Sequence, residues 1–282
     1  MRVISKPIYS VSDLFNICID GISNNRAYTD IKDELKYIHD TVMIDSKRYN
    51  IYANDVKLYI FQALNTLYRK SDKTNIKMLY RNQMSVKGKG GRKVYDKIML
   101  LALLGRCPFC GIGRVSTLDH YLPKGKYPVF SILPYNLVPS CKDCNTGKGA
   151  SVATTCGTQT LHPYYDDFTR EQWLFAKVMK SHPISIKYFV NPPIDWDDIS
   201  KARVEAHFND YDLGRRFSIE ASNELAKLNS SFSLFPLKKR QIKEQLNKGA
   251  LIFKSMHLNS WESALYQALA SNDWYCGGGY NV

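Results

Sequence analysis

The residues Cys107-Pro-Phe-Cys110-Gly111 form the first half of a pattern that decides how the middle of this 282-residue chain folds. The second half, Cys141-Lys-Asp-Cys144, follows after a gap of thirty residues. A two-residue gap lets both thiolates of a pair reach one ion, and four thiolates favour a closed, tetrahedral, structural Zn²⁺ site. The rival interpretation is two redox-active dithiols, but no thioredoxin-like βαβ pattern surrounds either pair. The spacing therefore predicts a module held by zinc on Cys107, Cys110, Cys141 and Cys144.

The regions on either side of this module differ from it in composition and pattern. Residues 106–165 hold both cysteine pairs and few long periodic runs, whereas residues 1–105 show apolar residues at helical spacing. Residues 166–282 combine helical patterns with alternating, strand-like ones. We expect a mainly helical α+β protein in three parts: a helical N-terminal region (1–105), the zinc module (106–165) and an α+β C-terminal region (166–282).

Apolar spacing and capping residues place individual elements along the chain. In the N-terminal region they predict helices over 13–22, 29–42, 54–67 and 93–104. In the C-terminal region they predict helices over 170–181, 220–228, 238–251 and 260–270, with strands over 184–190 and 204–208. The glycine-rich end after Cys276 is expected to be mobile, with the Cys276 thiol exposed.

The charge of the chain is strongly unbalanced. There are 39 Lys and Arg residues against 26 Asp and Glu, which gives a net charge of +13 and a pI near 9.3. Such a protein usually binds a polyanion, most often nucleic acid, or an anionic membrane surface, although some basic proteins have no such partner. Residues 69–97 alone carry ten basic and two acidic residues. Their Lys87–Arg92 stretch is loop-like, so it is either a flexible arm for phosphates or a solvated surface loop.

The N-terminus has no apolar core followed by a cleavage site, so no signal peptide is predicted. The longest apolar run, Ile98–Leu104, is far shorter than the roughly 20 residues that a membrane span needs. The seven cysteines suit an intracellular compartment, where thiols stay reduced. We expect a soluble, cytoplasmic protein without a membrane partner.

A second set of polar residues lies between and after the cysteine pairs: Asp119-His120, Asn136, Asn145 and Lys148. From Cys107 to Gly149 the chain resembles the HNH endonuclease family. The matching segments are Thr117-Leu-Asp119-His120-Tyr-Leu-Pro123-Lys124 and Asn136-Leu-Val-Pro-Ser-Cys141-Lys-Asp-Cys144-Asn145-Thr-Gly-Lys148. The resemblance implies a ββα fold in which the second cysteine pair begins the helix, Asp119 and His120 lie on the first strand, and Asn145 lies in the first helical turn.

The residue types suit hydrolysis of a phosphodiester bond. Histidine is largely neutral at pH 7, so His120 is the candidate general base. Asp119 and Asn145 offer oxygen ligands to a catalytic Mg²⁺ or Mn²⁺ and leave positions open for phosphate and water. The resemblance gives Asn136 a positioning role, and Lys148 is a candidate contact to a phosphate oxygen. His162 is either a support for the site or a packed structural histidine.

These features predict a metal-dependent HNH endonuclease that acts on nucleic acid, with double-stranded DNA as the expected substrate. The alternative is a non-catalytic zinc-stabilised module that binds nucleic acid or protein, which would not need an oxygen-ligand pair beside a histidine. A third interpretation is an anti-phage defence effector that acts beside a partner ATPase, as in the Septu type.

Overall fold

The computed structural model describes residues 1–61 and 69–281. The chain divides into two compact units, Arg2–Asp166 and Asp167–Val282, and Met1 belongs to the second. The expected N-terminal region and zinc module thus lie within one unit. Among the described residues the strands form two separate two-stranded sheets and helices dominate, which confirms the predicted mainly helical α+β class. No helix in the described part of the chain is long and apolar enough to cross a membrane.

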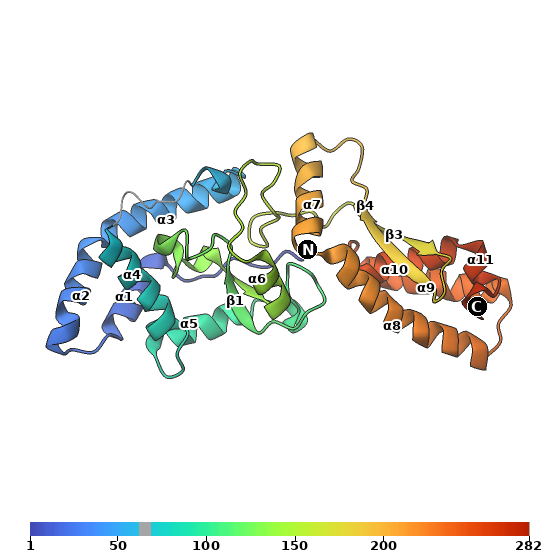
Figure 1. Cartoon of the computed structure of the whole chain (residues 1–282), viewed down its shortest axis with the longest axis horizontal. Helices are drawn as coiled ribbons and strands as arrows, with labels where there is room; N and C mark the ends of the chain where they lie inside the picture. Colours follow the sequence, from blue (N-terminus) through green and yellow to red (C-terminus); the bar gives the residue numbers. More distant parts are fainter. Residues whose placement is uncertain (62–68, 282) are drawn as a thin grey trace. The chain divides into compact units, whose positions relative to one another are not determined.

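The N-terminal part of the first unit is helical (Figure 1). Its helices are α1 (Val11–Asp20), α2 (Arg26–Tyr37), α3 (His39–Asn54), α4 (Lys70–Met78) and α5 (Gly90–Met99), and a π-helical segment, Leu79–Met84, joins α4 to the turn before α5. The side chain of Ser10 accepts a hydrogen bond from the backbone of Asp13 and so begins α1. Leu14, Phe15 and Cys18 then form the buried face of α1.

Several helix boundaries differ from the predictions. The predicted helix over 29–42 is divided at Ile38, which ends α2 and begins α3. The helix predicted over 54–67 is wrong at its start, because α3 ends there and a 3₁₀ turn follows at Leu58–Ile60; residues 62–68 lie outside the described residues. The predicted loop over 87–92 is partly helical, since α5 begins at Gly90. A side chain at Gly91 would meet the Cys18 sulfur at 2.9 Å, which explains why glycine stands there.

A ββα module follows in the same unit. Strands β1 (Thr117–His120) and β2 (Leu137–Ser140) pair antiparallel, with Thr117 opposite Ser140 and His120 opposite Leu137. Helix α6 (Lys142–Lys148) begins directly after Cys141. Helix α5 packs against both strands, and the Tyr95 hydroxyl accepts a hydrogen bond from the Leu118 backbone at 3.3 Å. This contact fixes the module on the N-terminal helices.

The second unit is built on the hairpin of β3 (Leu174–Met179) and β4 (Ser185–Val190). Helix α8 (Leu213–Leu234) packs on β4, and α10 (Trp261–Ser271) packs on β3 and on α9 (Lys239–Met256). Helices α7 (Asp198–Asp210) and α11 (Asp273–Cys276) complete the unit (Figure 1). Apolar side chains such as Ile186, Phe217, Leu246 and Leu269 form its core.

The strand predicted over 184–190 and the three later helices are confirmed. The helix predicted over 170–181 is wrong, because Leu174–Met179 pairs with β4 as a strand. The strand predicted over 204–208 is also wrong: it lies in α7, where Val204 and His207 are buried one turn apart. Cys276 is buried at the end of α11 rather than exposed, with 1% of its surface accessible.

Candidate functional site

Four cysteine side chains converge in the first unit, as the spacing predicts. The sulfur atoms of Cys107, Cys110, Cys141 and Cys144 all lie within 4.8 Å of one another, and all four residues are buried. Backbone N–H groups of Gly113 and Cys144 donate to the sulfurs of Cys110 and Cys141 at 3.4 and 3.5 Å. A hydrogen bond from Cys107 lowers the pKa of the Cys141 thiol. The cluster is compatible with one tetrahedral zinc ion.

Glycine shapes the turn behind the first cysteine pair. A side chain at Gly113 would lie 2.6 Å from the Cβ and Sγ atoms of Cys141, so only glycine lets the two halves of the cluster meet. Gly111 has a φ of +75°, and its N–H donates to the Cys107 carbonyl at 2.7 Å. The turn thus aims both thiols of the pair at the same point.

Asp119, His120 and Asn145 line one cavity of about 380 Å³ next to this cluster. Asp119 and His120 come from the end of β1, and Asn145 comes from the first turns of α6. The cysteine cluster joins the strand pair to α6 at Cys141 and Cys144, so it also sets where Asn145 stands relative to β1. The structure therefore brings together three of the five predicted site residues in one open space.

The carboxylate of Asp119 is buried, and one of its two oxygens accepts no hydrogen bond. The residue is 5% exposed, and its Oδ2 atom accepts no hydrogen bond. The Lys148 ammonium lies 4.0 Å from this oxygen, which is an ion pair at the limit of contact. Burial raises the pKa of Asp119 to about 6, and Lys148 opposes that rise. A buried carboxylate oxygen with so little compensation is suited to a cation.

His120 is held in one orientation by the backbone. Its Nε2 atom lies 2.9 Å from the Ser131 carbonyl oxygen, which can only accept a hydrogen bond. The proton of the neutral ring is therefore on Nε2, and Nδ1 keeps the lone pair. The Tyr80 ring packs edge-on against the imidazole, with 4.5 Å between centroids. Burial lowers the pKa of His120 to about 3, so the ring is neutral at pH 7.

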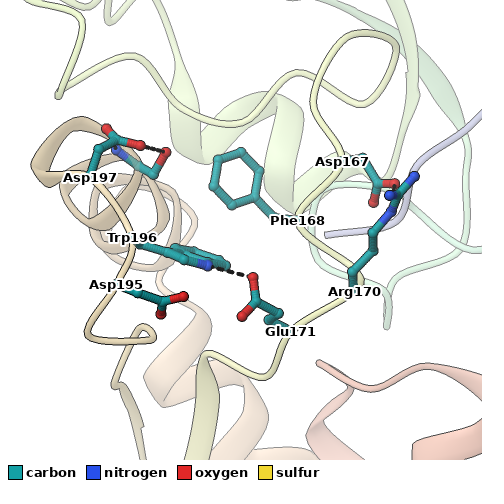
Figure 2. A pocket seen from close by; sticks show the side chains of 8 residues that line it. Asp167, Phe168, Arg170, Glu171, Asp195, Trp196 and Asp197 are labelled. Atoms are coloured by element: carbon teal, nitrogen blue, oxygen red, sulfur yellow. Dashed lines mark hydrogen bonds and ion pairs between the residues drawn. The ribbon is translucent and has the colours of Figure 1, made fainter.

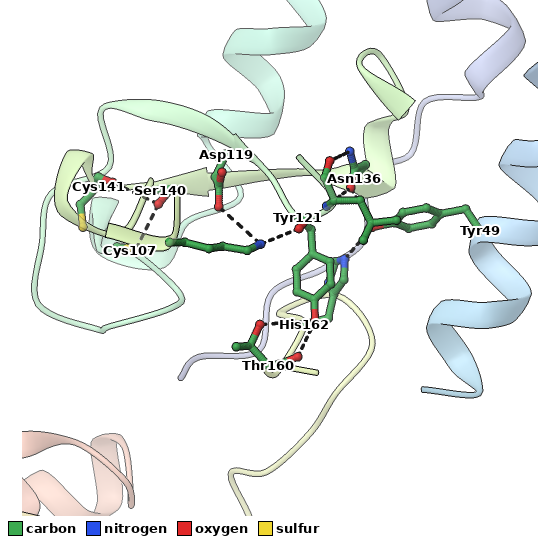
Figure 3. Close-up of polar contacts among 11 residues, drawn as sticks. Tyr49, Cys107, Asp119, Tyr121, Asn136, Ser140, Cys141, Thr160 and His162 are labelled. Carbon is green, nitrogen blue, oxygen red and sulfur yellow. Dashed lines mark hydrogen bonds and ion pairs between the residues drawn. The ribbon is translucent and has the colours of Figure 1, made fainter. Parts of the chain in front are cut away.

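Asn136 does not reach the cavity but braces the loop between β1 and β2 (Figure 3). It is fully buried, and its Nδ2 atom donates to the carbonyls of Leu122 and Phe130 at 3.0 and 3.1 Å. Its Oδ1 atom accepts from the Leu122 N–H at 2.7 Å and from the Tyr49 hydroxyl at 3.0 Å. These contacts hold the segment that directly follows His120.

His162 also belongs to this buried network. The Tyr164 N–H donates to its Nδ1 atom at 3.2 Å, which leaves the proton on Nε2, 3.2 Å from the Tyr49 hydroxyl (Figure 3). Tyr49 therefore accepts from His162 and donates to Asn136. His162 is 1% exposed and supports the loop from behind rather than lining the cavity. No local pattern pointed to Tyr49, which lies 87 residues before Asn136.

The two lysines of the module have different positions. Lys148 is 9% exposed, donates to the Tyr121 carbonyl at 2.5 Å and is not among the residues lining the cavity. Lys124 does line the cavity, and its ammonium lies 4.5 Å from the centre of the Tyr80 ring. Lys124 follows His120 by only four residues, and this proximity was the available signal for it.

The second unit contains a larger cavity, of about 510 Å³, with a different character (Figure 2). Four of its eight lining residues are acidic, so it would repel a phosphate. Three of these acids already have partners: Glu171 accepts from the Trp196 indole at 2.7 Å, Asp197 caps α7 through Ser200, and Asp167 pairs with Arg170 at 3.4 Å. The residues that line this cavity include no histidine and no side-chain amide, unlike those of the cavity in the first unit.

No protein-family model matches the chain, and no solved structure matches it. The chain is similar to "Protein ea31" of Escherichia phage lambda, with 29% identity over 295 aligned residues. The alignment covers 97% of this chain and 98% of the phage protein, so the similarity extends through both compact units. The name of that protein states no activity.

Proposed function

We propose that the chain is a metal-dependent endonuclease of HNH type that hydrolyses phosphodiester bonds in double-stranded DNA. The observation that carries the proposal is the single cavity lined by Asp119, His120 and Asn145 beside the four-cysteine cluster. A hydrolytic site needs a base for water, oxygen ligands for a cation and room for a phosphate. The three side chains offer the first two, and the cavity offers the third.

The four cysteines serve this site by holding its scaffold. Zinc bound by four thiolates keeps no open position for substrate, so its role is structural. The ion would add to the small hydrophobic core that two four-residue strands and a seven-residue helix can supply. Its binding free energy is in effect folding free energy for the module.

Asp119 and Asn145 are the residues that would hold the catalytic Mg²⁺ or Mn²⁺. The fit rests on the Asp119 Oδ2 atom, which is buried and accepts no hydrogen bond, and on the neutral amide of Asn145 across the same cavity. Hard divalent cations prefer such oxygen ligands. When bound, the cation would supply Lewis-acid polarisation of the scissile phosphate.

The protein's own groups perform the remaining steps. The Ser131 carbonyl keeps the His120 proton on Nε2, so Nδ1 can accept a proton from the attacking water. Asn136 keeps the loop after His120 in place and thereby fixes the imidazole relative to Asp119. The Lys124 ammonium, on the cavity wall, can contact a phosphate oxygen. Lys148 instead lies beside Asp119, where its charge favours the ionised carboxylate.

A plasmid assay tests this proposal. Supercoiled DNA incubated with purified protein should be converted to nicked or linear forms only after Mg²⁺ or Mn²⁺ is added. Asp119→Ala and Asn145→Ala should each require a higher cation concentration for half-maximal cleavage, while zinc content stays near one per chain. Asn209→Ala, in α7 of the second unit, is a matched control. Cleavage that is independent of added cation, or unchanged in both site variants, would contradict the proposal.

The alternative is a non-catalytic zinc module that binds nucleic acid. It predicts DNA binding without cleavage at any cation concentration. The unbonded Asp119 carboxylate oxygen argues against it, because a phosphate-binding surface gains nothing from a buried negative charge.

A further inference from the structure

Three leucines crowd the turn that leaves α5. Leu100, Leu103 and Leu104 are 78%, 61% and 74% exposed, although they lie within five residues of one another. Single exposed apolar side chains are ordinary, but three large ones on one turn form a patch that needs an explanation. The turn itself is anchored, because Ile98, which precedes the three leucines, and Ala102, which lies among them, are both buried. We call Leu100, Leu103 and Leu104 the leucine turn.

The backbone of the leucine turn adopts an unfavourable conformation. Leu104 has φ 55° and ψ 19°, in the left-handed region that residues with a side chain rarely adopt. Glycine would be less strained there, and glycine does stand at the next position, where φ is also positive. The chain therefore keeps a large apolar side chain pointing into solvent at a position where stability favours its removal.

The surroundings of the leucine turn are basic. Lys97 lies one helical turn before Leu100, and Arg106 and Arg114 face each other across a β-bridge; all three are exposed. No Asp or Glu occurs from residue 97 to residue 118. Arg114 makes no ion pair within the described ranges. An apolar patch with this rim is complementary to a polyanion that also offers an apolar interior, and duplex DNA has both properties.

Hydrogen bonds tie the leucine turn to the wall of the candidate site. The Arg106 N–H donates to the Leu103 carbonyl at 3.1 Å, and the Val115 N–H donates to the Gly105 carbonyl at 2.9 Å. Val115 comes two residues before Thr117, which lines the cavity together with Tyr95 of α5. The leucine turn is thus hydrogen-bonded to the segment that leads into the cavity wall.

We propose that the leucine turn is a wedge that inserts between base pairs of duplex DNA from the minor groove, and that it bends the substrate of the adjoining site. The inference rests on the proposed nuclease function for its substrate. Proteins that enter the minor groove insert Leu, Ile or Phe between base steps and kink the duplex, while nearby Arg and Lys neutralise phosphates. Leu103 and Leu104 would enter the stack, and Lys97, Arg106 and Arg114 would contact the flanking phosphates.

Fluorescence of 2-aminopurine tests the wedge directly, because this base brightens when it is unstacked. The probe is a set of thirty-base-pair duplexes with 2-aminopurine at successive steps, mixed with the full chain without added divalent cation. Wild type should raise the fluorescence at one or two steps. The double variant Leu103→Ser, Leu104→Gly should bind at least about tenfold more weakly and show no rise even at saturation, because the leucine side chains that would be buried in the duplex are absent.

Two controls separate this effect from misfolding and from general surface change. Leu104→Gly removes strain, so the double variant should keep its zinc and its unfolding midpoint. Leu251→Ser changes a leucine of similar exposure, 67%, on α9 of the second unit and should behave as wild type. The salt dependence of binding should be the same in all variants, because the phosphate contacts remain.

The wedge is overturned if wild type saturates the duplex, as seen by anisotropy, without any rise in fluorescence. It is also overturned if the double variant gives the wild-type rise, or if its only effect is to dissociate a dimer in sedimentation experiments. Plasmid cleavage by wild type with Mg²⁺ keeps the two ideas apart. Cleavage without unstacking rejects the wedge alone, whereas unstacking without cleavage rejects the nuclease and leaves a DNA-bending protein.

Discussion

The two units of the chain each contain one antiparallel strand pair, and the two pairs are stabilised in different ways. The β3–β4 pair has six-residue strands whose buried side chains, such as Val178 and Ile186, pack against helices. The β1–β2 pair has four-residue strands that carry Asp119, His120 and Ser140 as buried residues. Leu118, Leu137 and Val138 of this pair are buried as well, so the cysteine cluster and the polar side chains there adjoin an apolar core.

This difference shows how a small module can bury a reactive polar set. A core made of apolar side chains has no room for an unbonded carboxylate or a histidine with a free nitrogen, since each costs free energy when buried. A cluster that binds metal can supply that free energy from a few ligands and leave neighbouring positions for chemistry. The polar cavity accordingly lies beside the cysteine cluster, and the apolar strand pair lies in the other unit.

Removal of zinc should produce the largest effect. It should destabilise the β1–β2 pair and leave the β3–β4 pair intact. Structural zinc contributes about 10–16 kcal/mol of binding free energy in small domains, so Cys144→Ser should abolish the cooperative unfolding of the β1–β2 module. Hydrogen exchange should become fast in β1, β2 and α6 and stay slow in β3 and β4. Cys156→Ser, a cysteine outside the cluster, is the control. Equal loss of hydrogen-exchange protection in both strand pairs would refute the claim that zinc stabilises the β1–β2 pair alone.

A cavity made in the β3–β4 pair should destabilise the second unit and leave the β1–β2 module intact. Ile186 is 2% exposed in β4, and its replacement by Ala should destabilise the second unit by about 2–5 kcal/mol. Calorimetry should show the decrease in the transition of that unit, while zinc content and cleavage at low temperature stay unchanged. Ile199→Ala, at a position 45% exposed on α7, should change stability by less than about 0.5 kcal/mol. A drop in zinc content in the Ile186 variant would count against independent stabilisation of the two strand pairs.

The hydrogen-bond network behind the site should have a smaller effect. Tyr49→Phe removes the hydroxyl between His162 and Asn136 and should cost about 1–3 kcal/mol, because a buried donor is left unpaired. Cleavage should slow at saturating DNA, since the loop after His120 is less well held. Tyr37→Phe, at a position 83% exposed, serves as the control for chemical denaturation and for kinetics. Identical unfolding curves for the two variants would remove Tyr49 from the network.

The basic surface of the first unit should give the smallest effect. Arg92 donates to the Ser85 carbonyl and pairs with Asp96, so it is partly structural, whereas Lys93 and Lys97 are exposed. Lys93→Ala with Lys97→Ala should weaken DNA binding and flatten the log–log salt dependence by about 0.9 for each phosphate that these lysines neutralise. Lys248→Ala with Lys254→Ala in α9 is the matched pair. An unchanged slope would exclude this face from the DNA-binding surface.

Local spacing predicted those parts of the molecule whose causes are local. The two Cys-x-x-Cys pairs indicated the cluster because a two-residue gap is sufficient to aim both thiols at one point. The strand at Ser185–Val190 was visible in the alternation of Ile186 and Tyr188. Asp119, His120 and Asn145 were placed together by a resemblance that contains their spacing, and the structure has them on one cavity.

Long-range contacts determine the features that were not predicted. Residues 174–179 have a composition that suits a helix, and only pairing with β4 makes them a strand. Residues 204–208 were predicted to be a short strand, but the Asp197 cap begins a helix before them, and Val204 and His207 are buried at helical spacing. Lys124, rather than Lys148, lines the cavity because Lys148 turns inward to the Tyr121 carbonyl, a contact between residues 27 positions apart.

The cleavage rate of His120→Ala tests the central claim most directly. The imidazole is not a ligand of the four-cysteine cluster, so the variant should retain zinc content and DNA affinity close to wild type. With saturating Mg²⁺ its single-turnover cleavage should fall by at least about 10²-fold, the usual contribution of a general base. His182→Ala, at an exposed position of the second unit, should cleave as wild type. Cleavage by His120→Ala at the wild-type rate, in a preparation free of contaminating nuclease, would contradict the account.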